Sequence, residues 1–445
     1  MLKAGFARLD ITPPLGEDLA GYYHRRSADG VLDPLYVNAL ALESAQTRTL
    51  MIAIDAICID TDRCDLVRSM IAERTGVPAD YIYVATLHQH TAPWYIVGEA
   101  RGATFRDKIF DDVVNRKLCD VAQMALDDLC EATVSVAERE VAEHIGFVRR
   151  YYTADGIIKT NPNTDKYTLT GRCAEADNVM RLVRFHREGA NDVALVNFST
   201  HPDVIGGNKW SADWPGFTRK FVEADLDGVS CIFFTGCQGD SNHIDYFKPK
   251  EQRLKGSTTA KSYEHSRFMG RTVADAVLAV WNETRAVSAD TIVAQTRTVY
   301  NKTNLEGIEY YDEAVAWDTE YRRLEAEGNR QNIPHPYIQD VAHARRLISL
   351  RTAPIFKAIP MMLLSLGDVV FVGFGGEPFT SYGQIVRDTM PDKHVICTVC
   401  TGGYGGYFPT AEAFAQGGYE VISSILTPTV EQELIDTVKD MASHI

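Results

Sequence analysis

The chain has 445 residues, of which 45% are hydrophobic and 24% are charged, so we expect an ordinary globular protein without extended disorder. The formal net charge of −15 opposes binding to phosphate backbones, and nucleic acid is therefore not an expected partner. No apolar run is long enough to cross a bilayer, the N-terminus lacks the apolar core of a signal peptide, and nine scattered cysteines fit a reducing compartment, which together predict a cytoplasmic protein.

Five apolar runs rich in Val, Ile and Phe, each followed by polar residues, predict the strands of a sheet. They lie at 51–54, 81–87, 193–198, 231–234 and 369–374. Continuous runs of this kind are typical of strands that are buried on both faces. Helical spacing marks three further segments, at 66–71, 217–224 and 434–441. The pattern predicts an α/β fold with a mixed, mostly buried β-sheet flanked by helices.

A more polar stretch at about 301–351 predicts an inserted helical hairpin that packs on the main domain. Apolar residues recur along it with the period of an amphipathic helix, at Tyr310, Ala314, Trp317, Tyr321 and Leu324. Gly328 and Pro334 interrupt the pattern, and a second helix is predicted to begin near Tyr337. The aromatic face of the first helix is interpreted as core rather than as a ligand pocket. We expect one domain over residues 1–445 that carries this hairpin as an insertion.

Side chains capable of acid–base or metal chemistry follow the predicted strands. In chain order they are Asp55, His88, His90, His201, Asp240 and Glu377. Because strand ends on one side of an α/β sheet form the crevice where ligands bind, we expect these residues to converge on a single site. Turn chemistry alone explains Asp55 and Asp240, but it has no particular use for imidazole.

His88 and His90 stand one residue apart, so an extended chain places both imidazoles on the same side, where they could hold a metal ion. Each ring could instead form ordinary hydrogen bonds in a wet crevice, and the spacing alone does not decide. Cys397 and Cys400 have C-x-x-C spacing, but the sequence has no second pair, so a four-thiolate zinc site is not favoured.

Several motifs, taken in order along nearly the whole chain, are similar to those of a known family. They are 4–16, 19–22, 33–36, Thr86-Leu87-His88-Gln89-His90-Thr91-Ala92-Pro93, 211–216, Gly376-Glu377, Gly406-Tyr407 and 418–420. In this order they resemble the catalytic domain of the neutral/alkaline non-lysosomal ceramidases, whose T-H-T-H-S-x-P segment is similar to the histidine motif here. The resemblance implies a ceramidase-like metal hydrolase fold.

The same resemblance implies one Zn²⁺ ion bound by two histidines, a glutamate and a tyrosine. Matched motif by motif, these ligands are His88, His201, Glu377 and Tyr407. His90 and Tyr419 would line the site, and either Arg149 or Arg150 would match an arginine that contacts the substrate.

Such a ligand set makes chemical sense, because imidazoles and a carboxylate leave zinc able to polarise a carbonyl and to activate water. His90 and Asp240 are candidates for proton transfer or for orienting another ring, and the Tyr407 phenol could stabilise oxyanion charge. Tyr407 lies in a glycine-rich segment, 402–409, and could equally anchor that loop by packing.

Two departures from the family's pattern affect the substrate and the nucleophile. The family's catalytic serine lies two positions after the aspartate that matches Asp240, where this chain has Asn242, and Ser241 is displaced by one. Water activated by the metal is therefore the favoured nucleophile, with Ser241 kept as a candidate. The chain also leaves no room for the family's C-terminal immunoglobulin-like domain, which favours a soluble substrate over membrane ceramide.

Three functions stay open. The first is zinc-dependent hydrolysis of an amide C–N bond in a small soluble substrate, and an ester or lactone would use much the same chemistry. The second is cleavage of a glycoside or uronate in an oligosaccharide-like substrate. Its acids would be Asp55, Asp213 and Asp240, and its sugar-stacking aromatics Trp94, Tyr95, Trp210 and Trp214. The third is a metal-binding protein without catalysis. The oligomeric state is not indicated, and a homo-oligomer stays open.

Overall fold

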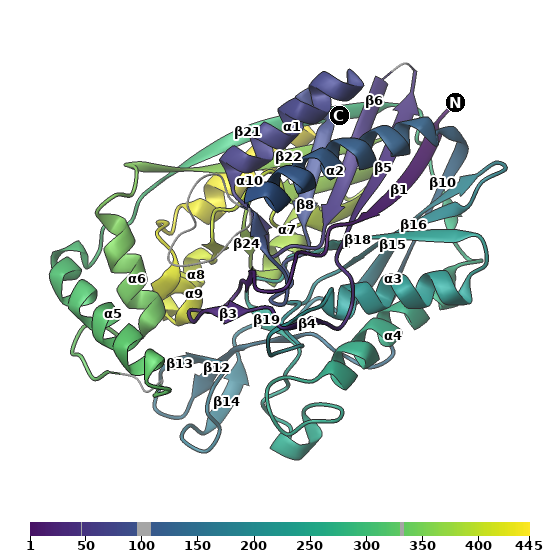
Figure 1. The fold of residues 1–445 in the computed structure, drawn as a ribbon. Coiled ribbons are helices and arrows are strands. Elements are labelled where there is room, and N and C mark those ends of the chain that lie inside the picture. The colour runs from purple at the N-terminus through teal and green to yellow at the C-terminus, as the bar shows by residue number, and fades with distance from the viewer. Residues whose placement is uncertain (46, 96–107, 330–332) are drawn as a thin grey trace.

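A nine-stranded mixed sheet is the largest sheet of the computed structural model, which describes residues 1–45, 47–95, 108–329 and 333–445 (Figure 1). Its main path is β18-β16-β15-β10-β1-β5-β6-β8, and β20 pairs with β10. The strands are β1 (Lys3–Asp10), β5 (Tyr36–Ser44), β6 (Thr47–Ile54), β8 (Ile82–Thr86), β10 (Cys130–Glu140), β15 (Val179–Arg187), β16 (Asp192–Phe198), β18 (Val229–Thr235) and β20 (Arg285–Ala286). The pairs β6/β8 and β16/β18 are parallel, and the other pairs are antiparallel.

A second sheet of four strands packs against the first. Its order is β21-β22-β23-β25, with bounds Ile292–Lys302, Phe356–Leu366, Val369–Phe374 and His394–Thr398. Buried side chains of both sheets, such as Leu195 and Phe234 of the large one and Leu364 and Phe371 of the small one, share one hydrophobic core. The strand predicted at 369–374 therefore exists, but it belongs to the second sheet. The apolar pattern of a single strand does not indicate which sheet the strand joins.

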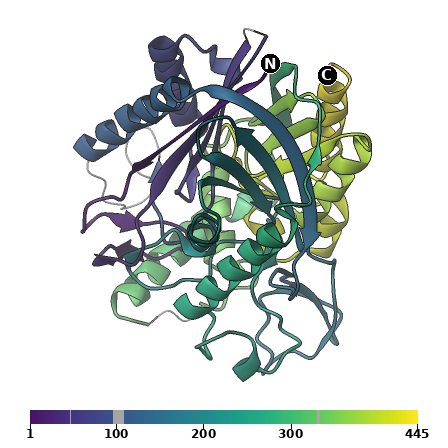
Figure 2. The ribbon, with the colours of Figure 1, turned by 90° about the vertical axis from the view of Figure 1, so that its right-hand side faces the viewer.

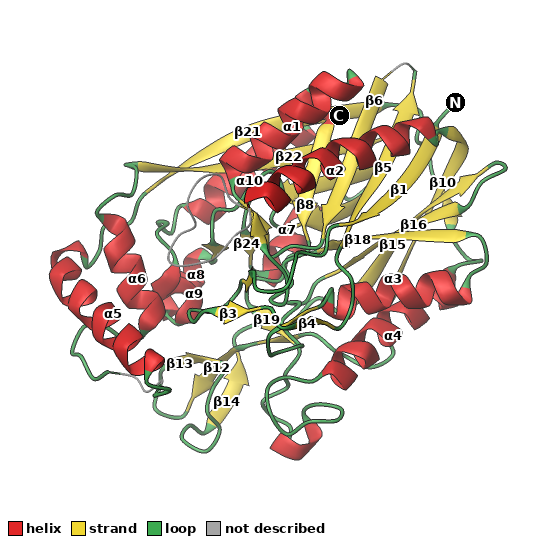
Figure 3. Cartoon of the chain, in the orientation of Figure 1, coloured by secondary structure: helices red, strands yellow, loops and turns green. Residues whose placement is uncertain are grey.

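Helices cover the outer faces of the two sheets (Figures 2 and 3). Apolar residues of α1 (Thr61–Thr75) and α2 (Lys108–Asp127) pack on the large sheet, and those of α7 (Thr380–Thr389) and α10 (Val430–Ala442) pack on the small one. Two more helices pack on the large sheet and against each other: α3 (Asp213–Asp225) lies on β18, and α4 (Tyr263–Val280) lies on β10 and β15. The predicted helices at 66–71, 217–224 and 434–441 are confirmed. No helix within the described ranges combines the length and apolarity that a bilayer crossing needs.

The predicted helical hairpin lies between β21 and β22. It consists of a 3₁₀ turn (Ile308–Tyr310), α5 (Tyr311–Ala326) and α6 (Val341–Leu350), which share a small core of their own around Trp317. The second helix begins four residues later than the spacing predicts, because the Asp340 side chain accepts a hydrogen bond from the His343 amide at 3.0 Å and caps it.

Short elements complete the chain and frame the loops around the strand ends. The strands are β2 (Asp18–Leu19), β3 (Arg26–Ser27), β4 (Gly30–Val31), β7 (Cys58–Ile59), β9 (Trp94–Tyr95), β11 (Phe147–Val148), β12 (Arg150–Thr153), β13 (Ile158–Thr160), β14 (Leu169–Arg172), β17 (Lys209–Trp210), β19 (Ser241–Asn242), β24 (Glu377–Pro378) and β26 (Tyr407–Phe408), and the helical pieces are 3₁₀ turns Ala79–Tyr81 and Lys250–Gln252, α8 (Ala411–Gln416) and α9 (Tyr419–Ser423).

The large sheet curls so that its two end strands approach each other. The Thr235 hydroxyl at the end of β18 donates to the Leu87 carbonyl just after β8, at 2.8 Å. The small sheet is hydrogen-bonded to the large one at this place, because the Asn197 side chain of β16 donates to the Cys397 carbonyl of β25 at 3.0 Å. The carboxyl ends of β8, β16, β18 and β23 consequently meet in one place.

Candidate metal centre

Two imidazoles and one carboxylate meet where these strands end. The Nε2 atoms of His88 and His201 lie 3.1 and 3.2 Å from the same oxygen, Oε2 of Glu377. Ligand atoms about 2.0–2.1 Å from a tetrahedral zinc ion are roughly 3.3 Å apart, so the two measured separations match edges of such a site. All three side chains are at most 3% exposed, which leaves little water to satisfy them.

Backbone carbonyls orient both imidazoles. Nδ1 of His88 lies 2.8 Å from the Ile57 carbonyl, and Nδ1 of His201 lies 3.0 Å from the Gln238 carbonyl. With Nδ1–H donated to a carbonyl, each ring presents the Nε2 lone pair to the site, the arrangement that metal-binding histidines use. His88 itself has a φ of 72°, a left-handed conformation that costs energy in a non-glycine residue and turns the chain sharply after β8.

Charges of the three groups are coupled. Burial alone would lower the pKa of His88, but Glu377 and Cys400 raise it well above its usual value. Burial alone would likewise raise the pKa of Glu377, but the two histidines hold it well below its usual value. Burial and Arg149 lower the pKa of His201. The Glu377 carboxylate therefore stays ionised in a buried site, and its charge is balanced either by a proton on His88 or by a cation in the place of that proton.

His90 lies beside this group. Its ring centroid is 5.2 Å from that of His88 and 5.5 Å from that of His201, and one ligand atom from each of the three rings lies within 4.8 Å of the others, so the histidines could hold a metal ion. Among the described residues, neither ring nitrogen of His90 nor Nε2 of His201 finds a hydrogen-bond partner, although all three atoms are buried. Orphaned buried nitrogens of this kind fit a metal ion and its ligands.

Tyrosines and an arginine border the centre. Strand β24 pairs in parallel with β26, which sets Tyr407 opposite Glu377. The Tyr407 ring centroid is 6.5 Å from that of His201, and Arg149 Nη2 donates to the Tyr407 hydroxyl at 3.2 Å. The Tyr419 ring packs edge-on against Tyr407, with centroids 5.8 Å apart. Burial and Glu377 raise the pKa of Tyr407 well above its usual value.

The two candidate arginines differ in what they contact. Arg149 reaches Tyr407, whereas the guanidinium of Arg150 binds Glu420 at 3.2 Å and Gln416 at 3.2 Å. Glu420 also accepts from Arg149 Nε at 2.8 Å, so one buried carboxylate holds both cations. Only Arg149 is thus placed against the predicted site residues.

Asp240 and Ser241 lie near the centre but bind other groups. Oδ1 of Asp240 accepts from the backbone amide and the hydroxyl of Thr380, both at 2.7 Å, at the start of α7. The Ser241 hydroxyl donates to the Gln238 carbonyl at 3.3 Å, the same carbonyl that orients His201. A direct part in catalysis for either residue stays a prediction.

The carboxylates predicted to cleave sugars are engaged inside the protein. Asp55 forms a two-bond ion pair with Arg219, at 2.9 and 2.6 Å. Asp213 accepts from the amides of Val204 and Ile205 and from the Ser266 hydroxyl. Of the predicted stacking aromatics, three are buried and one is partly exposed. The buried ones are Tyr95, Trp210 and Trp214, and the partly exposed one is Trp94.

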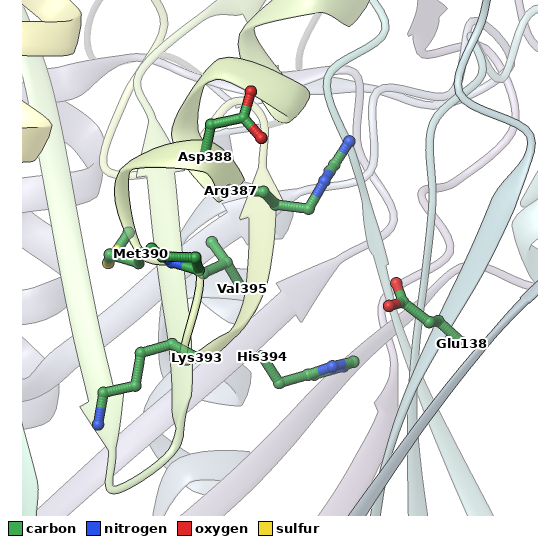
Figure 4. Close-up of a pocket in the computed structure, with 8 residues that line it drawn as sticks. Glu138, Arg387, Asp388, Met390, Lys393, His394 and Val395 are labelled. Atoms are coloured by element: carbon green, nitrogen blue, oxygen red, sulfur yellow. The ribbon is translucent and has the colours of Figure 1, made fainter.

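The C-x-x-C cysteines do not face each other. Cys397 forms a hydrogen bond with Cys237, and Sγ of Cys400 lies 3.6 Å from Nδ1 of His88. A cavity of about 250 Å³ lies elsewhere, where Arg387 of α7 and His394 of β25 extend toward Glu138 of β10 (Figure 4). Its lining includes none of the predicted site residues.

Tyr404 contacts Glu377, although the pattern of polar residues at strand ends does not predict Tyr404 as a site residue. Its hydroxyl donates to Oε1 of Glu377 at 2.7 Å, the oxygen that does not face the histidines. The glycine-rich segment 402–409 is the only sequence signal for it, and that segment contains two tyrosines of which only Tyr407 matches a family motif.

Comparison with solved structures shows a ceramidase fold. The chain superposes on neutral ceramidase from Pseudomonas aeruginosa with a TM-score of 0.71 and 14% identity, covering 100% of this chain and 75% of that one. A structure described as ceramidase complexed with C2 gives 0.72 and 14%, covering 99% and 74%. No protein-family model and no curated protein sequence matches the chain. At this identity the likeness establishes the fold, which confirms the fold class expected from the sequence.

Proposed function

We propose that the protein is a metal-dependent hydrolase that cleaves an amide bond of a small soluble substrate. The observation that carries the proposal is the approach of His88 Nε2 and His201 Nε2 to the same oxygen, Glu377 Oε2, at 3.1 and 3.2 Å, distances that match two edges of a tetrahedral zinc site. We propose Zn²⁺ as the ion, because it suits two imidazoles and a carboxylate with a further position open.

A Zn²⁺ ion held there would polarise a substrate carbonyl and activate water at neutral pH. The surrounding side chains then have separate tasks. Arg149 holds the Tyr407 hydroxyl at 3.2 Å, so a phenol and a guanidinium stand together where oxyanion charge would develop. We propose Tyr407 as the fourth ligand, because β24 and β26 set it opposite Glu377.

His90 is the proposed proton carrier. Burial lowers the pKa of His90 well below its usual value, which keeps the free ring neutral, and the proposed role is to take a proton from water and deliver it to the leaving nitrogen. The neutral ring also has no hydrogen-bond partner among the described residues that would compete for that proton. An amide needs such a donor, because an amine leaves only after protonation.

Two observations favour an amide over a sugar as the substrate. The solved structures that share the fold are named as ceramidases, enzymes that cleave an amide bond. The carboxylates that a glycosidase would use, Asp55 and Asp213, are already satisfied by internal donors. Carbohydrate cleavage is therefore the less supported of the two reactions.

Metal analysis tests the centre first. Purified protein incubated with zinc should retain about one ion per chain, and His88→Ala or His201→Ala should abolish retention. Cys400→Ala is a matched control, because its sulfur lies 3.6 Å from the His88 ring without belonging to the proposed ligand set. Loss of zinc in the control, or its persistence in both histidine variants, contradicts the ligand assignment.

A substrate panel tests the reaction. The zinc-loaded protein should hydrolyse members of a series of chromogenic short-chain N-acyl amides and leave chromogenic glycosides intact. Turnover confined to glycosides would overturn the amidase proposal, and bound zinc without turnover on either series would favour a non-catalytic protein.

A further inference from the structure

Contacts hold the backbone and the ring faces of His90, whereas its two ring nitrogens have no hydrogen-bond partner among the described residues. The backbone amide of His90 donates to the Pro202 carbonyl at 3.0 Å, and Arg26 Nη2 donates to the backbone carbonyl of His90 at 2.5 Å. Gly21, with a φ of 98°, lies so close that an added Cβ would be 2.6 Å from Nδ1. The Tyr22 ring packs against the imidazole at 5.5 Å. A side chain held this firmly, with both nitrogens buried and unpartnered, is preorganised for a ligand rather than for packing alone.

One carboxylate, that of Asp203, faces the ring. Its Oδ1 lies 3.5 Å from Nδ1 of His90 and accepts a hydrogen bond from the Tyr22 hydroxyl at 2.5 Å. Lys261 binds the same oxygen and also donates to the backbone carbonyl of Asp203 at 2.5 Å. Tyr22 and Lys261, from two segments distant in sequence, therefore fix this carboxylate in place, although Asp203 touches none of the proposed metal ligands in these contacts.

We propose that Asp203 is a positioning residue for His90. The carboxylate lies on the Nδ1 side of the ring, so it favours the tautomer with a proton on Nδ1 and leaves the Nε2 lone pair free. Carboxylate–imidazole pairs in other enzymes fix a tautomer in this way, and loss of the carboxylate leaves a ring that can rotate or carry its proton on the wrong nitrogen. A separation of 3.5 Å is longer than a hydrogen bond, and such contacts tighten when a ligand binds.

The inference rests on the proposed metal centre and adds to it a role that Lys261 and Tyr22 share. Without Asp203, the Lys261 ammonium and the Tyr22 hydroxyl would lose their common acceptor, and the cation would remain next to His90. The carboxylate therefore also shields the imidazole from that charge. Its removal should weaken binding of a ligand that uses His90 but should not affect retention of the ion.

Binding of acetohydroxamate to the cobalt-substituted protein tests the coupling. The hydroxamate chelates the ion as an amide mimic, and the visible spectrum of Co²⁺ reports both the ion and the ligand. Asp203→Asn and His90→Gln should each keep about one Co²⁺ per chain and weaken acetohydroxamate binding about tenfold. The double variant should lose little more than either single variant, because Asp203 acts through His90. Lys261→Met gives a second route, with a smaller loss expected.

The matched control is Asp177→Asn. Asp177 is also a largely buried carboxylate between two cations, since it accepts from Arg181 at 2.9 Å and from Arg387 at 3.1 Å, and it should leave acetohydroxamate binding unchanged. Unaltered binding in Asp203→Asn, or losses that add fully in the double variant, overturns the positioning role alone. Failure of the unaltered protein to retain Co²⁺ overturns the proposed function, and the inference with it.

Discussion

Replacement of Arg219 by Met should strongly destabilise the fold. Arg219 makes two hydrogen bonds to Asp55, and the side chains are 3% and 0% exposed. Methionine has a similar length and no charge, so the variant leaves the Asp55 carboxylate buried without its counter-ion. Asp55 also accepts from the side chain of Gln89, which lies between His88 and His90, so the ion pair supports the loop of the proposed centre.

The magnitude follows from burial. Breaking a buried ion pair by removing one partner costs about 3–5 kcal/mol, because the remaining charge is uncompensated. Asp55 keeps two other donors, Gln89 Nε2 at 2.7 Å and the Tyr36 amide at 2.8 Å, so we expect a loss near the lower end, about 3 kcal/mol. Total stabilities are typically about 5–15 kcal/mol, so this is a large fraction.

Urea denaturation of metal-free protein at neutral pH measures the effect as a change in the free energy of unfolding. Arg74→Met is the matched control, because its pair with Asp120 is about half exposed and should contribute less than about 1 kcal/mol. Adding Asp55→Asn to Arg219→Met should recover part of the loss, since it removes the unpaired charge. A loss in Arg219→Met no larger than in the control, or a further loss in the double variant, would refute the reasoning.

Three further outcomes are expected. Gly21→Ala should reduce turnover and acetohydroxamate binding by displacing His90, whereas Gly16→Ala, with a similar φ of 93° and nothing within 4 Å of the added Cβ, should cost only stability in thermal melts. Burial lowers the pKa of His265 to about 4, so the folded state prefers the neutral ring and loses up to about 3 kcal/mol as pH falls from about 6.5 to 4; His265→Gln should flatten this part of the stability profile measured by urea denaturation. Trp317→Ala should raise hydrogen exchange in α5 and α6 while the two sheets keep their protection, and uniform loss throughout the chain would contradict a separate hairpin core.

Local sequence patterns were sufficient to predict these strands and helices and the residues at their ends. The apolar runs mark β6, β8, β16, β18 and β23, because a strand buried on both faces leaves a continuous signal. Helix α1 ends where Gly76 adopts a φ of 74°, as a glycine stop predicts. His88, His201 and Glu377 follow three of these strands, so the local pattern places each of them at a strand end, whereas the approach of Glu377 to the histidines depends on the packing of the two sheets.

Properties that depend on contacts between residues far apart in the chain could not be predicted from local sequence patterns. The curl of the large sheet and the separate small sheet arise from packing between strands far apart in the chain, which periodicity does not record. The hydrogen bonds from Thr380, at the start of α7, to the Asp240 carboxylate join segments 140 residues apart, which no local pattern records. Asp203 carried no local signal for a role, since its contact with Lys261 depends on how two loops approach each other.

The proposed ligands belong to different layers of the molecule, and that arrangement has a consequence for assembly. His88 and His201 extend from the large sheet, whereas Glu377 follows the small one, so an ion bound to all three would add a cross-link between the two sheets. Metal affinity would then depend on whether the two sheets are packed against each other. A truncated chain that stops before β23 should lack that affinity even if its large sheet forms, and added metal should protect the complete chain against separation of its layers.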